Sequence, residues 1–371
     1  MKRFVLRKSQ YAFLPALNPT RRRWLDRSLK VLLVIALGYV LYEQRIRGQD
    51  LGQLYHHARQ ELGPESLMWV LLAFCLMPLN WWLESRKWQC FTARFSNLSA
   101  REHLRAVLVG VTFSLFTPNR LGDYLGRVLA SMDTSRQAII LATVAANLVQ
   151  LVVLLGFGWL GALYFFPAWV QIDWGRWWPL AALGIGATIA LAIMLLHLPN
   201  LLFIVKRWPQ IQRIGFVRHS VDVAKTYTRR PVLRALGLAA ARYGVYSLQY
   251  YCMLRVAGID LDMGTALAGI ASVFLIQTSV PLPPALGLIA RGEIALFMWG
   301  HFADNELSIL MATYGLFLIN LLLPGLYGLA TVVQMNLIKP NEHDHSIVTN
   351  RRPGTDHDHA DGPFPTGGTH D

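Results

Sequence analysis

The sequence has few charged residues and few cysteines. Only 15% of its 371 residues are Asp, Glu, Lys or Arg, whereas 54% are hydrophobic. The three cysteines, Cys75, Cys90 and Cys252, lack the Cys-x-x-Cys spacing of metal or redox sites. A His-Glu-x-x-His protease motif is also missing. The longest segments outside hydrophobic runs have about 30 to 40 residues, and a catalytic core usually needs at least about 50. We therefore expect neither enzymatic activity nor a metal or cofactor.

Long hydrophobic runs occupy most of the chain instead. Such a run crosses a bilayer as a helix, because every backbone amide must be hydrogen-bonded where water is absent. The candidate spans are residues 29–42, 67–83, 138–166, 177–198, 232–254 and 307–333. The first is the shortest, with an uninterrupted apolar part that rises only about 18 Å. The sequence predicts an all-α polytopic membrane protein whose transmembrane domain covers residues 29–335.

Two further hydrophobic stretches are interrupted by proline and glycine. Residues 104–130 are broken near their middle, and so are residues 264–300. Each half is too short to span, so we interpret both stretches as re-entrant helical hairpins, giving about eight membrane segments in all. Re-entrant hairpins require other helices or a polar cavity to satisfy the freed backbone groups. The breaking residues are Thr117, Pro118 and Gly122 in the first hairpin, and Pro281, Pro283, Pro284 and Gly287 in the second.

The basic residues indicate an orientation. A net charge of +13 would favour nucleic acid as a partner of a soluble protein, but here Lys and Arg lie in short segments between apolar runs. There they orient helices and contact anionic lipids. Segments assigned to one side contain 25 of them, and those assigned to the other contain four. We predict a multi-pass protein of the cell (inner) membrane with cytoplasmic termini. With six spans, the two hairpins must then enter from opposite faces, as in inverted repeats.

The cytoplasmic segments differ in character. Residues 1–28 are basic, and residues 198–234 have the pattern of an amphipathic helix that anchors on anionic lipid. Residues 336–371 are polar and rich in Gly, Pro, His and Asp, which predicts a disordered tail. A solvated tail is favoured over weak metal binding by its histidines, which include His343, His345, His357 and His359.

The first hairpin carries the main candidate site. Arg120, Asp123 and Arg127 are spaced three and four residues apart, which places them on one helical face. Pro118 suits the first helical turn, and Thr117 is its expected N-cap. Charges at membrane depth are costly and usually functional. The extra arginine and the helix N-terminus favour a phosphate or another anionic head group. A closed Arg-Asp-Arg salt bridge that only holds the hairpin is an equal alternative.

Further polar residues lie on later segments. Arg291 and Glu293, in the second hairpin, are either a structural pair or part of a substrate site. Arg242 lies inside the fifth span and must face protein or water, so it is a candidate for a cavity wall or for pairing with Glu293 or Asp123. It begins a polar stripe formed by Arg242, Tyr246, Gln249 and Tyr250.

Other residues favour helix packing. The glycines of residues 156–161 match a dinucleotide-binding pattern, but they lie inside an apolar span, where they favour close helix contact. Asn147, Gln150 and Asn320 are expected to form hydrogen bonds between helices, worth about 0.6 kcal/mol each.

The two broken segments resemble those of a known family. Thr117-Pro118-Asn119-Arg120-Leu121-Gly122-Asp123 is similar to the Pro-Gly-x-Leu-Gly-(Glu/Asp) segment of the lysylphosphatidylglycerol synthase transmembrane region family, also described as flippase-like domain proteins. Residues 281–293 are similar to its second Pro-rich segment, which ends in Glu. Asn119 stands where glycine is common in the family. The resemblance covers about residues 25–335.

This resemblance implies a membrane bundle that moves or accommodates amphipathic lipids. In full-length synthases a separate soluble domain transfers an aminoacyl group to the lipid, and we expect no such domain here. The leading hypothesis is transport or flipping of a lipid or lipid-linked amphiphile with an anionic head group. The alternative is a non-transporting scaffold for a glycosyltransferase or a lipid-modifying enzyme. Membrane lipids are the expected partners, and nucleic acid is not.

The predicted topology can be tested by cysteine labelling. In a Cys-free background, we expect an impermeant reagent added outside to label single cysteines at Asp50, Ile172 and Asp304. It should not label cysteines at Phe95, Gly215 and His345. Protection at position 304 together with labelling at position 172 would show that the second broken segment crosses the membrane fully.

Overall fold

The computed structural model describes Ser28 and residues 63–115, 117, 121–131, 134–197, 228–279, 284–303 and 305–334. Several sequence-based predictions lie outside these residues. They concern the basic segment 1–28, the first candidate span, most of the amphipathic loop and the tail, as well as Pro118, Arg120, Pro281 and Pro283. The described residues form helices joined by turns and loops, with no strand among them, as predicted.

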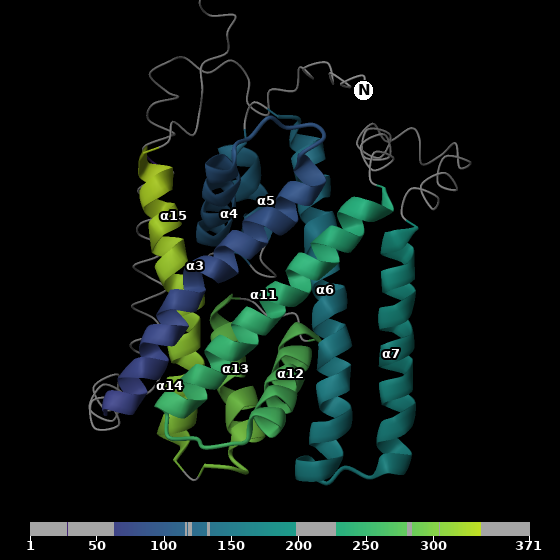
Figure 1. Cartoon of the computed structure of the whole chain (residues 1–371), viewed down its shortest axis with the longest axis vertical. Helices are drawn as coiled ribbons and strands as arrows, with labels where there is room; N and C mark the ends of the chain where they lie inside the picture. Colours follow the sequence, from purple (N-terminus) through teal and green to yellow (C-terminus); the bar gives the residue numbers. More distant parts are fainter. Residues whose placement is uncertain are drawn as a thin grey trace, which may run out of the picture. The chain divides into compact units, whose positions relative to one another are not determined.

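The helices follow the predicted order (Figure 1). Their bounds are α3 Pro64–Thr92, α4 Ala100–Ser114, α5 Leu121–Ala130, α6 Arg136–Phe165, α7 Trp174–Leu196, α11 Arg229–Val256, α12 Met263–Ser279, α13 Pro284–Trp299, α14 Glu306–Phe317 and α15 Leu323–Gln334. A π-helical turn, Phe166–Val170 (η2), extends α6, and another, Leu318–Leu322 (η3), joins α14 to α15.

Several helices have the length and composition of membrane spans. Within the described residues these are α3, α6 with η2, α7, and the continuous α14–η3–α15 segment. Helix α11 is also long, at 28 residues, but it carries more arginine. Many large hydrophobic side chains on α3 and α7 are exposed, including Leu71, Leu183 and Ile189. Such a surface suits lipid, and the chain is therefore a multi-pass membrane protein.

Each predicted hairpin region consists of two short helices that pack against each other. Helices α4 and α5 have 15 and 10 residues, and α12 and α13 have 17 and 16. At 1.5 Å per residue, the longest rises about 26 Å, less than the roughly 30 Å of a hydrocarbon core. In Figure 1, the α4–α5 pair lies at the end where α3 finishes, and the α12–α13 pair lies at the end where α11 finishes.

Local caps fix where the first pair begins and turns. Ser99 and Glu102 form a reciprocal capping box at the start of α4. Between the two helices, the Thr117 hydroxyl accepts a hydrogen bond from the Gly122 amide at 2.6 Å. The Thr117 hydroxyl thus contacts the first turn of the second helix, but it lies four residues before Leu121, where that helix begins, and so it is not at the predicted N-cap position.

Glycines allow α4 and α5 to approach closely. A Cβ on Gly126 would lie 2.6 Å from the Gly110 Cα, and a Cβ on Gly122 would overlap the Phe113 carbonyl. On α6, a Cβ on Gly161 would lie 2.7 Å from the Ala268 carbonyl oxygen of α12. The predicted packing role of the 156–161 glycines is thus confirmed at Gly161.

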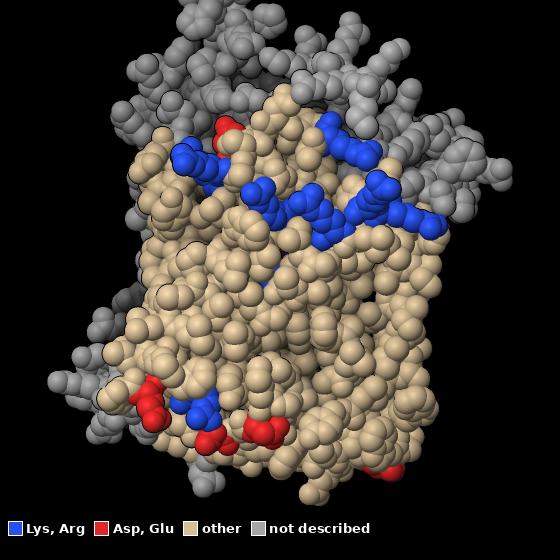
Figure 2. Space-filling model, in the orientation of Figure 1, with Lys and Arg blue, Asp and Glu red and all other residues tan. Residues whose placement is uncertain are grey.

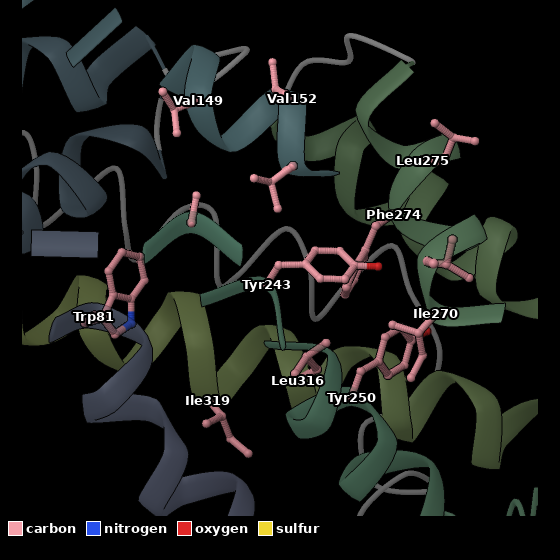
Figure 3. Close-up of a cluster of buried hydrophobic side chains, with 14 of the residues drawn as sticks. Trp81, Val149, Val152, Tyr243, Tyr250, Ile270, Phe274, Leu275, Leu316 and Ile319 are labelled. Atoms are coloured by element: carbon pink, nitrogen blue, oxygen red, sulfur yellow. The ribbon is translucent and has the colours of Figure 1, made fainter. Parts of the chain in front are cut away.

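Aromatic side chains attach α12 and α13 to the rest of the bundle. Phe274 of α12 lies beside Tyr243 of α11, with ring centroids 6.0 Å apart (Figure 3). Its ring centroid lies 5.0 Å from that of Tyr246. Trp299 at the end of α13 donates its indole N–H to the Tyr250 hydroxyl at 3.1 Å. That hydroxyl also lies 2.9 Å from the Thr313 hydroxyl of α14. The second pair is therefore held by buried aromatic rings and by neutral hydrogen bonds.

The glycine contact predicts a position-specific effect of a methyl group. Gly126→Ala should force α4 and α5 apart and lower the melting temperature in detergent, because the new Cβ would meet backbone atoms. Gly156→Ala is the matched control, since nothing lies within 4 Å of its Cβ position. Alanine is favoured over glycine inside a helix by about 1 kcal/mol, so the control should be neutral or stabilising. Equal melting temperatures for the two variants would contradict this packing.

Candidate functional site: a buried charge cluster

A group of charged side chains is buried where α3, α5, α6 and α11 meet. It contains Glu84 and Lys87 of α3, Asp123 and Arg127 of α5, and Arg242 of α11; Gln150 of α6 completes it. We call these six residues the Glu84 cluster. The Lys87 side chain is only 1% exposed, and that of Arg242, the most accessible member, is 15% exposed. Charged groups buried in this way are usually paired.

Glu84 contacts all three cations of the cluster. Its carboxylate oxygens lie 2.6 Å from the Lys87 Nζ and 2.9 Å from the Arg127 Nη2. The Arg242 Nη1 lies 3.3 Å from the same carboxylate. Arg127 also donates from Nε to the Asp123 Oδ1 at 2.8 Å. One carboxylate therefore connects three helices, and Arg127 connects the two carboxylates.

Neutral groups complete the surroundings of the cations. The Gln150 side-chain oxygen accepts hydrogen bonds from Lys87 at 3.0 Å and from Arg242 at 3.3 Å. The Arg127 guanidinium lies 5.2 Å from the ring centroid of Trp88, and that of Arg242 lies 5.5 Å from Trp81. Cation–π contacts of this kind stabilise a charge that has lost much of its water.

The cluster has more cationic than anionic side chains. Three cations face two carboxylates, so one positive charge is uncompensated when all five groups are ionised. The Arg127 Nη1 is buried and has no hydrogen-bond partner among the described residues. A buried donor without a partner is costly, and an anion would satisfy both the donor and the charge.

The structure brings three of the predicted site residues together. Asp123 and Arg127 pair on one face of α5, as the sequence predicts, whereas Arg120 lies outside the described residues. Arg242 joins them, but its carboxylate partner is Glu84 and not Glu293 or Asp123. The predicted salt bridge is thus present at Arg127, within a larger network.

Sequence reasoning missed Glu84 and Lys87. It ended the second span at Leu83 and assigned residues 84–105 to a cytoplasmic loop. Helix α3 instead continues to Thr92, which keeps both residues inside the bundle. The signal was the absence of proline and glycine between Leu83 and Thr92, which leaves nothing to stop the helix.

The remaining stripe residues of α11 have structural partners. Tyr246 stacks on Phe274, and Gln249 donates to the Ala73 carbonyl at 2.8 Å. Tyr250 bonds to α13 and α14 as described above. The second hairpin does not contribute to the cluster: among the described residues, Arg291 and Glu293 have no ion-pair partner. Pro284 and Gly287 lie in the first turns of α13.

The predicted interhelical hydrogen bonds are confirmed. Asn147 of α6 donates to the Tyr124 hydroxyl of α5 at 3.3 Å. Asn320 in η3 accepts from the Asn80 amide of α3 at 2.9 Å. Gln150 forms the third bond, within the Glu84 cluster. Its role is larger than the sequence indicated, because both of its donors are cations.

No metal site stands out in the described ranges. They contain no group of three or more His, Cys, Asp or Glu side chains that could hold an ion. Cys75, Cys90 and Cys252 are free thiols. The histidines of the tail lie outside these ranges.

Long apolar helices, two pairs of short helices and a buried charge cluster define a polytopic α-helical membrane protein. The profile of the lysylphosphatidylglycerol synthase TM region matches residues 27–328. The chain therefore belongs to this family, as the broken segments indicated. A comparison with curated protein sequences found no match.

Loss of Arg127 should strongly destabilise the protein. Arg127→Gln leaves Asp123 without its partner and removes one cation from Glu84. Breaking a buried pair from one side costs about 3–5 kcal/mol. We expect a lower melting temperature in detergent, partly restored by adding Asp123→Asn. Arg136→Gln, at an exposed arginine, is the control. A double variant no more stable than Arg127→Gln would contradict the pairing.

Proposed function

We propose that the protein moves a lipid or lipid-linked amphiphile with an anionic head group between the leaflets of a membrane. The proposal rests chiefly on the cationic side chains of the Glu84 cluster, which outnumber its carboxylates by three to two. Membership of a family of membrane domains supports it. When all five groups are ionised the cluster carries one net positive charge, which is costly inside a bundle and usually functional. An anionic head group that entered the cluster would neutralise that charge.

The chemistry of the cations favours a phosphate. Guanidinium groups present parallel N–H donors that match phosphate oxygens. The two guanidinium groups approach Glu84 from α5 and α11, and Arg242 is the more accessible of the two. Arg242 is therefore the first contact that we assign to a head group, with the unpartnered Arg127 Nη1 as the second.

We also propose six spans and two re-entrant hairpins, with cytoplasmic termini in the cell (inner) membrane. Helices α4–α5 and α12–α13 would then enter from opposite faces. Figure 2 supports this arrangement: on the face in view, Lys and Arg cross one end, Asp and Glu predominate at the other, and the surface between is nearly free of charge. By the positive-inside rule, the basic end is cytoplasmic.

Lipid movement by the purified protein tests the function. The protein is reconstituted in liposomes with a trace of fluorescent phosphatidylglycerol, and an impermeant reductant measures exchange between the leaflets. Arg242→Gln should slow exchange about 10- to 100-fold, because a charge-assisted contact contributes about 1.5–3 kcal/mol. Folding should survive, since Glu84 keeps Lys87 and Arg127.

Two comparisons make the result specific. Arg234→Gln changes an exposed arginine on the same helix and should leave exchange unaltered. Fluorescent phosphatidylcholine, which has no net charge, should move more slowly than phosphatidylglycerol.

Arg120→Gln in the same assay tests the sequence-based prediction for that residue. If exchange is unchanged in Arg242→Gln and in Arg120→Gln while stability falls, the ligand role is wrong and the scaffold alternative is favoured.

A further inference from the structure

Lys87 is the only cation of the Glu84 cluster that can lose its charge. A guanidinium stays protonated in proteins, whereas a buried lysine amine can exist in either form. The amine forms an ion pair with the Glu84 carboxylate at 2.6 Å and donates a hydrogen bond to the Gln150 oxygen at 3.0 Å. An ammonium has three N–H groups and a neutral amine has two. Two oxygens thus lie close to the amine, which is one fewer than the N–H groups of an ammonium.

The net charge of the cluster also depends on whether Lys87 is protonated. With Lys87 neutral, Arg127 and Arg242 balance Glu84 and Asp123, and the net charge is zero. With Lys87 protonated, the net charge is +1 at a site where the Lys87 side chain is only 1% exposed. An uncompensated charge in such a place is unfavourable. Release of the Lys87 proton therefore removes the surplus charge of the empty cluster.

An arriving anion reverses this preference. A head group with one negative charge would make the neutral cluster net negative, and one proton on Lys87 would restore neutrality. We propose that Lys87 is a proton site that couples head-group binding to proton uptake: its amine takes one proton from water when the anion binds and returns it when the anion leaves. The proposal rests on the proposed function. No electrons move, and lipid and proton enter the site together.

Other groups near Lys87 could also respond to pH. On its own helix it faces Glu84, and Arg242 approaches from α11. From α5 come Asp123 and Arg127, and α6 offers only the neutral Gln150. On α4, the His103 ring lies 5.3 Å from that of Trp88, next to Lys87 in sequence. Because histidine titrates near neutral pH, His103 is the group that the experiment must separate from Lys87.

The experiment counts protons during binding. Dihexanoyl phosphatidylglycerol, whose single phosphodiester keeps one charge through the neutral range, is titrated into the purified protein in an uncharged detergent at mildly alkaline pH. Calorimetry in two buffers of different ionisation enthalpy gives the number of protons exchanged. We expect uptake of about one proton per lipid, and an affinity that falls about tenfold per pH unit above the range where the empty cluster releases its proton.

Two variants of Lys87 should abolish the coupling in opposite ways. Lys87→Met fixes the neutral state and should bind more weakly, and Lys87→Arg fixes the charged state and should keep tight binding. Neither should take up a proton or show the pH slope. His103→Gln should retain both. Melting temperatures establish that each variant is folded. Methionine and arginine differ in size, so if one of the two Lys87 variants fails to fold, the other still tests the coupling.

The outcomes separate this inference from the proposed function. Tight binding to the parent protein without proton uptake would overturn the role of Lys87 and leave anion binding intact. Proton uptake that persists in Lys87→Met or disappears in His103→Gln would also overturn it. If the parent binds neither dihexanoyl phosphatidylglycerol nor other anionic lipids, the proposed function and the proton coupling are both wrong.

Discussion

The carboxylate of Glu84 is the contact on which the centre of the bundle depends. Three cations from three helices converge on it. Asp123 is the only further carboxylate in the cluster that offsets their charge. Inside a membrane, water cannot replace a lost partner, so neutralising Glu84 would remove a carboxylate from all three cations at once. The positions of α3, α5 and α11 are therefore interdependent, with α6 joined to them through Gln150.

Close backbone packing brings the charges of α5 into this network. Helices α4 and α5 touch at Gly110 and Gly126, and the Asp123 carboxylate occupies the space that a Cβ on Gly110 would need. Small residues in the first hairpin thus have an electrostatic consequence. A hairpin held farther from the bundle would withdraw Arg127 from Glu84, and the desolvation cost of both would no longer be offset. The close packing of the two helices at Gly110 and Gly126 therefore determines where Asp123 and Arg127 lie in the charge network.

The sequence predicted local features well and long-range ones poorly. The two broken stretches were predictable because proline, glycine and hydroxyl side chains act within a few positions, as at Thr117 and Gly122. The pairing of Asp123 with Arg127 was predictable for the same reason, since the two are four residues apart. The partner of Arg242 was not, because Glu84 is 158 positions away and had been assigned to a loop. Charged residues such as Glu84 and Lys87 at the end of an apolar run resemble the start of a loop. The partners that let the helix continue come from other helices, which the local sequence does not show.

The two short-helix pairs are similar in layout and different in chemistry. The α4–α5 pair contributes two buried charges, whereas the α12–α13 pair is attached by Phe274, Trp299 and neutral hydrogen bonds. Charge networks in a low dielectric require specific partners, but aromatic contacts tolerate small shifts with little cost. If a head group enters at the cluster, the first pair must hold its geometry while the charge is compensated. A shift of the second pair would instead disturb the hydrogen bonds that join Trp299, Tyr250 and Thr313, and neutral hydrogen bonds contribute less than those of charged groups.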